Sequence, residues 1–123
     1  MNEPLAQVIS ALQERAREIR SLEAEAQKAL YERGDEASYR RKLAAKTDLL
    51  SQLPTALAPL LAELPEGERE RIAERLDRFA ASAGRARALE SVFYMAALLY
   101  PADYREGEPN DLENWLKQLE DQK

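Results

Sequence analysis

The chain has 123 residues, with 23 acidic and 18 basic side chains, a formal net charge of −5, and neither cysteine nor histidine. Disulfides, thiol nucleophiles and the commonest metal ligands and general bases are therefore excluded, and we expect no catalytic residue, no metal site, no cofactor and no enzyme activity. Acidic and basic residues are interleaved, so the sequence offers no basic field for nucleic acid.

The composition is typical of helices, because Ala, Leu, Glu and Arg dominate and only four Gly occur. We predict an all-α single domain over residues 1–123, an antiparallel helical bundle of three long helices plus a short C-terminal helix. No apolar run approaches the ~20 residues of a membrane span, and the first ten residues do not form a secretory signal. A cytoplasmic location is the expectation.

The first predicted helix is the longest, since Asn2 can cap it, Pro4 fits its first turn, and Gly34 supplies the left-handed stop. Its length is roughly 29 residues. An apolar stripe follows a three-four spacing along it: Leu5, Ile9, Leu12, Ala16, Ile19, Leu22, Ala26 and Leu30. The stripe fits an intramolecular core or a dimer contact. Three helices cannot cover all of it, so we predict a homodimer.

A second helix is predicted to begin at Glu36 with Asp35 as its cap, and the short turn folds it back against the first helix. Two prolines, Pro54 and Pro59, interrupt its pattern. Each removes a backbone donor, so we expect a kink there, with Thr55 as a new cap.

The third predicted helix begins at Pro65, and its apolar face continues across Gly84 into VFYMAALLY, residues 92–100. The pattern favours one helix through to Tyr100, and a break at Gly84 is the alternative. Nine consecutive residues without a charge would make this run apolar on every side, which is typical of an interior helix. We therefore predict that Phe93 lies at the centre of the core.

The last helix is predicted after a loop over residues 101–110, with Asn110 and Glu113 as a capping box. Four apolar residues share one face of it: Leu112, Trp115, Leu116 and Leu119. Because a helix of about eleven residues is unstable alone, it must dock. We expect it to cover the side of residues 92–100 that carries Tyr94, Met95 and Leu98.

A cluster of basic residues is the first candidate for partner contact: Arg40, Arg41, Lys42 and Lys46. It fits an anionic partner or an ordinary solvated face, and four charges are too few for strong nucleic-acid binding at physiological salt. Tyr104, in the long loop, is a second candidate contact. Glu23 falls close to the apolar stripe of the first helix, where we expect it to pair with an Arg of a neighbouring helix.

The stretch LEAEAQKALYERGDEASYRRKLAAKTDLLSQL, residues 22–53, combines a long helix, a Gly-Asp turn and a Lys followed by paired leucines. In these features it resembles the helical hairpins of flagellar export chaperones. The resemblance implies a helical hairpin and assigns no site residue.

These observations favour a non-catalytic helical protein-protein interaction module: a self-associating bundle, an adaptor or a chaperone-like protein. Its partner would be a protein or a second copy, with neither nucleic acid nor membrane. The alternative is a small-ligand-binding or regulatory domain that uses the aromatic and Met-containing centre as a pocket.

Overall fold

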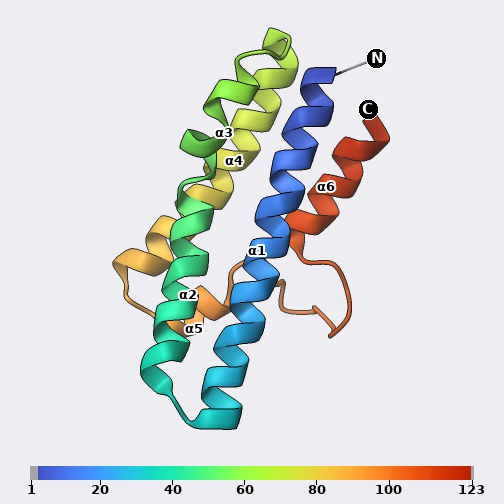
Figure 1. The fold of residues 1–123 in the computed structure, drawn as a ribbon. Helices are drawn as coiled ribbons and strands as arrows, with labels where there is room; N and C mark the ends of the chain where they lie inside the picture. Colours follow the sequence, from blue (N-terminus) through green and yellow to red (C-terminus); the bar gives the residue numbers. More distant parts are fainter. Residues whose placement is uncertain (1–2, 123) are drawn as a thin grey trace.

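The computed structural model describes residues 3–122, which form helices joined by short turns and one loop (Figure 1). The helices are α1 (Glu3–Arg33), α2 (Glu36–Ser51), α3 (Leu53–Leu61), α4 (Glu66–Ala88), α5 (Val92–Ala97) and α6 (Asp111–Gln122). The predicted all-α class is confirmed, since no strand occurs within residues 3–122. The predicted cap at Asn2 lies outside the described residues.

The turn between α1 and α2 forms as its sequence predicts. Gly34 adopts φ 61°, its N–H donates to the Leu30 carbonyl at 3.1 Å, and the N–H of Asp35 donates to Ala29 at 2.8 Å. This left-handed ending satisfies carbonyls that α1 leaves free. Asp35 then caps α2 by accepting from the N–H of Ser38 at 3.0 Å. Helix α2 consequently runs back beside α1 (Figure 1).

The predicted break in the second helix is confirmed and lies at Gln52, between α2 and α3. Pro54 occupies the first turn of α3 and Pro59 its interior. The predicted cap at Thr55 is wrong, because Gln52 takes the cap position. A proline is tolerated in a first turn, where its missing N–H has no partner, so α3 begins before Pro54 rather than after it.

Helix α4 starts after Pro65 as predicted and crosses Gly84, but it ends at Ala88. The predicted continuation to Tyr100 is wrong. Glu90 takes φ 51°, and Ser91 caps the separate helix α5 by accepting from the N–H of Tyr94 at 3.2 Å. A serine favours a cap because its hydroxyl offers the backbone an alternative to the continuous helix.

Residues 92–100 are not the centre of the core, and the prediction for Phe93 is wrong. Met95 and Leu99 are buried, but Phe93 is 75% exposed and Tyr94 is 53% exposed. The reason is geometric: α5 packs mainly against α2 and α4, and the side of it that carries Phe93 and Tyr94 is left uncovered. The main core instead combines apolar residues of α1, α2, α3, α4 and α6 with Leu64 and Leu99 from the connecting segments.

Helix α6 has the predicted capping box: Asn110 and Glu113 exchange bonds between backbone N–H and side chain at 2.8 and 2.9 Å. Its four apolar residues are buried, as predicted. Its docking position differs from the prediction, because α6 lies along α1, and its Trp115 ring lies 5.8 Å from Phe79 of α4. The loop after α5 carries the chain past the side of α1 that the other helices leave open (Figure 1).

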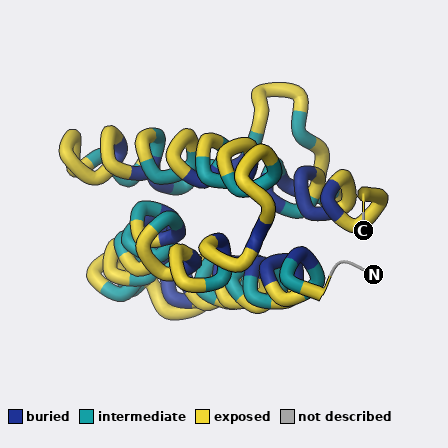
Figure 2. The backbone as a smooth tube through the Cα atoms, turned by 90° about the horizontal axis from the view of Figure 1, so that it is seen from above, coloured by how far each residue is buried: buried dark blue, intermediate teal, exposed yellow. Residues whose placement is uncertain are grey.

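Helix α6 packs along α1, and the first part of the apolar stripe of α1, from Leu5 to Ile19, is enclosed within one chain. Leu5, Ile9, Leu12 and Ile19 are each at most 2% exposed. In Figure 2 the buried positions of the helices face the interior and the exposed positions lie outside. Leu22 and Leu30, farther along the same stripe, remain partly exposed, and the homodimer stays a prediction.

Candidate functional site

The structure separates the four basic residues that the sequence groups together. The amine of Lys42 lies 3.1 Å from the carboxylate of Glu25 on α1, whereas the side chain of Lys46 is entirely buried. Arg40 and Arg41 are exposed on the outer side of α2. Lys46 is therefore absent from the surface, which keeps Arg40, Arg41 and the ion-paired Lys42.

Lys46 joins three parts of the fold. Its Nζ lies 2.8 Å from a carboxylate oxygen of Glu23 on α1 and donates to the carbonyls of Ala96 at 3.2 Å and Leu98 at 3.1 Å. The ammonium group thus has two hydrogen-bonded carbonyls and one carboxylate around it. Burial lowers the pKa of Lys46, and the carboxylate of Glu23 opposes that shift. The expected partner of Glu23 on a neighbouring helix is therefore a lysine and not an arginine.

Tyr100 extends this network from the loop after α5. Its hydroxyl donates to Glu23 at 2.6 Å and accepts from Arg20 at 3.1 Å. Its ring centroid lies 5.2 Å from Nζ of Lys46 and 5.6 Å from the guanidinium carbon of Arg20. Burial, reinforced by the bond to Glu23, raises the pKa of the Tyr100 hydroxyl. The hydroxyl consequently stays protonated and acts as a donor to the carboxylate.

Arg20 connects α1 to α6 and to the loop. It holds Glu113 through two bonds, of 3.1 and 2.7 Å, and donates to the Glu108 carbonyl at 3.1 Å. The bond to Glu113 raises the pKa of Arg20 and lowers that of Glu113. Tyr104 donates to the same Glu108 carbonyl at 2.6 Å and packs edge-on against Tyr100, with 4.7 Å between the centroids. Tyr104, predicted as a partner contact, is thus half-buried and fixes the loop.

The lowered pKa of Glu113 makes an acid effect testable. A carboxylate whose folded pKa lies below its unfolded value contributes stability above the unfolded pKa and loses it as pH falls through the folded pKa. We therefore expect part of the acid-induced loss of the free energy of unfolding to disappear in Glu113→Gln, whose curve should be flatter below pH 5. Urea titrations between pH 3 and 7 measure this. Parallel curves for parent and variant would contradict it, and Glu63→Gln, at an exposed turn, is the control.

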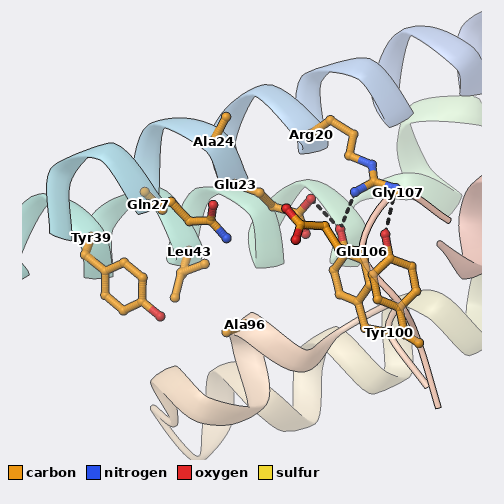
Figure 3. Close-up of a pocket in the computed structure, with 12 residues that line it drawn as sticks. Arg20, Glu23, Ala24, Gln27, Tyr39, Leu43, Ala96, Tyr100, Glu106 and Gly107 are labelled. Carbon is orange, nitrogen blue, oxygen red and sulfur yellow. Dashed lines mark hydrogen bonds between the residues drawn. The ribbon is translucent and has the colours of Figure 1, made fainter. Parts of the chain in front are cut away.

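A cleft of about 750 Å³ opens beside this network. Its walls come from α1, α2, α5 and the loop of residues 98–110: Arg20, Glu23, Gln27, Tyr39, Leu43, Ala96, Tyr100 and Glu106 are among the lining residues (Figure 3). The Lys46 ammonium lies behind the Glu23 carboxylate and is itself inaccessible. The cleft therefore presents carboxylate, amide and phenol groups over an apolar floor.

A second feature is an apolar corner at the junction of α4 and α5, formed by Leu89, Phe93 and Tyr94. Their side chains are 66%, 75% and 53% exposed, and the two aromatic rings lie 5.5 Å apart, edge to face. Leu89 and Tyr94 also line a groove of about 450 Å³ that reaches Arg85. Tyr94 thus lies beside both Phe93 and the groove that Leu89 lines.

Sequence reasoning identified Glu23 but missed Arg20, Lys46 and Tyr100 as members of one network. A signal for Lys46 was present: it follows Leu43 by three residues and precedes Leu50 by four, so it shares the buried face of α2. No comparable signal exists for Tyr100, because its position depends on how the loop folds against α1.

Comparison of the chain with protein-family models, curated proteins and solved structures finds no match. Within residues 3–122, no helix has the length and apolar character needed to cross a membrane. The same residues bring no three His, Cys, Asp or Glu side chains together in a way that could hold a metal ion.

Proposed function

We propose that the chain is a non-catalytic helical interaction module whose long helices form an antiparallel bundle that presents the apolar corner to a protein partner. The observation that supports this is the exposure of Leu89, Phe93 and Tyr94 within six positions of the chain. Large apolar side chains grouped on a surface are typical of interaction sites, and aromatic residues are enriched where binding energy concentrates. A cytoplasmic location belongs to the same proposal, and neither nucleic acid nor membrane is part of it.

The charges around the corner favour an acidic amphipathic helix as the partner. Arg40 and Arg41 line a groove shared with Val92 and Met95, and Arg85 lines the groove beside Leu89. Within residues 3–122 none of these three arginines forms an ion pair: Arg41 and Arg85 donate to serine hydroxyls at 2.7 and 3.2 Å. Glu90 lines the same groove as Arg40 and Arg41, and Arg41 also acts electrostatically on Asp35. A helix with an apolar face and flanking Asp or Glu would cover the corner and pair with these arginines.

Photo-crosslinking tests the surface directly. We expect benzoylphenylalanine in place of Phe93 to join, in native extract, a discrete protein through a segment that is apolar on one face and rich in Asp and Glu. Mass spectrometry of the crosslinked peptide identifies the sequence of that segment. The same probe in place of Gln118, exposed on α6, should give no such product.

Charge variants supply the second readout. Arg40→Glu with Arg85→Glu should reduce the crosslink strongly and leave the urea midpoint nearly unchanged, because both side chains are exposed and make no ion pair within the described residues. A crosslink to a second copy of the chain would show that the apolar corner mediates self-association and does not bind a different protein. Equal labelling from positions 93 and 118 would contradict the proposal.

The alternative role, small-ligand binding at the aromatic and Met centre, takes a different form in the structure. Met95 is buried with Leu43 and Ala86, and Tyr94 faces outward, so the two do not line one pocket. The feature that favours a ligand is the cleft bordered by Tyr39 and Tyr100.

A further inference from the structure

The charge balance of the cleft is incomplete. Arg20, the cation that lines the cleft, is engaged by Glu113, Tyr100 and the Glu108 carbonyl, and the buried Lys46 next to the cleft is engaged by Glu23 and two carbonyls. These two ion pairs cancel. Glu106 lines the cleft as a further carboxylate and pairs with no cation among residues 3–122. The cleft therefore holds one unneutralised negative charge.

The remaining polar groups of the cleft also lack partners. Gln27 and the hydroxyl of Tyr39 line it, and neither makes a side-chain hydrogen bond within residues 3–122. In Figure 3 the side chain of Glu106 reaches from the loop toward Glu23 and Gln27, while Tyr39 and Leu43 lie toward the other end of the cleft. Acceptors thus gather at one end and an apolar surface continues from them, completed by Ala96 of α5.

From this arrangement we infer that the cleft binds a primary ammonium group carried on an apolar stem. The ammonium donates to the carboxylate of Glu106 and to the amide oxygen of Gln27, and the stem lies over Leu43, Ala96 and the ring of Tyr39. An anion is disfavoured, because the donors of Arg20 and Lys46 are already used and Glu106 would repel it. A neutral ligand with the same apolar stem would not give the Glu106 carboxylate charge-assisted hydrogen bonds.

The ammonium can belong to a free alkylamine or to a lysine side chain of another protein, and the inference holds for both sources. The cleft shares only Tyr100 with the residues that line the groove beside Leu89, and it includes none of Leu89, Phe93 and Tyr94, so the inference does not rest on the partner surface proposed above. Its failure would leave that proposal untouched.

Nuclear magnetic resonance titration tests the inference with three probes of equal chain length: hexylamine, hexanol and hexanoate. We expect hexylamine to shift the backbone amides of Gln27, Leu43 and Gly107, hexanol to bind about tenfold more weakly, and hexanoate to bind not at all. A blocked lysine, Nα-acetyl-lysine-N-methylamide, is the second amine arm. If the blocked lysine binds more tightly than hexylamine, the site is assigned to a lysine side chain of another protein. If hexylamine binds more tightly, the site is assigned to a free alkylamine.

Glu106→Gln should weaken hexylamine binding about tenfold while the hexanol affinity stays constant, because only the charge changes. The Glu106 side chain is exposed and makes no hydrogen bond or ion pair within residues 3–122, so the variant should unfold at the parent's urea concentration. Glu63→Gln is the matched control. Hexanol binding as tight as hexylamine, unchanged affinity in Glu106→Gln, or shifts confined to residues away from the cleft would each overturn the inference.

Discussion

Substitution of Glu23 by Gln is expected to lower the free energy of unfolding by about 3 kcal/mol, at the lower end of the range for a broken buried ion pair. The change removes the charge that faces a lysine with a fully buried side chain, 2.8 Å away. The carbonyls of Ala96 and Leu98 still accept from Lys46, which keeps the loss from being larger. Urea titration at pH 7 measures the effect.

The same variant should acquire a particular pH dependence. The folded pKa of Lys46 is already lowered by burial, and without Glu23 the opposing contribution disappears. Between the folded and unfolded pKa values the unfolded chain binds more protons, so the free energy of unfolding of Glu23→Gln should rise as pH increases through that window. Titrations at pH 7 and pH 9.5 compare the two conditions.

Two further variants define the origin of the effect. Glu25→Gln removes the exposed pair with Lys42 and should cost at most about 1 kcal/mol. Combining Glu23→Gln with Lys46→Met should recover much of the loss, because no buried charge is left without its partner. A loss in Glu23→Gln no larger than in Glu25→Gln would show that the buried pair does not hold α1 and α2 together.

Trp115→Ala is expected to cost about 3–5 kcal/mol, the range for truncating a buried large aromatic residue. Trp115 is 6% exposed, contacts Phe79 of α4, and belongs to the face that docks α6 on α1. Helix α6 has 12 residues and is too short to persist in water without docking. We therefore expect circular dichroism to show a loss of helix as well as a lower urea midpoint.

The matched control is Phe93→Ala, which removes an aromatic side chain that is 75% exposed. Its effect should stay within about 0.5 kcal/mol, as for surface substitutions without a special role. Equal losses in Trp115→Ala and Phe93→Ala would show that the exposed ring on α5 contributes as much to the free energy of unfolding as the docked face of α6.

The sequence by itself determined the elements whose causes are local. The left-handed Gly34, the cap at Asp35, the capping box of Asn110 and Glu113, and the apolar face of α6 all depend on neighbours a few residues away. Periodicity also indicated most of the buried residues of α1: six of the eight stripe residues are buried, whereas Leu22 and Leu30 are partly exposed.

Tertiary structure decided the points on which the sequence was ambiguous. VFYMAALLY reads as a core helix, yet a serine cap at position 91 starts a short helix that touches other helices on one side only, so Phe93 faces outward. The burial of Lys46 and its pairing with Glu23 and Tyr100 join residues up to 77 positions apart. Such pairings depend on how the helices and the loop are placed relative to one another, and residue spacing in the sequence does not specify that placement. Both the apolar corner and the cleft arise from it.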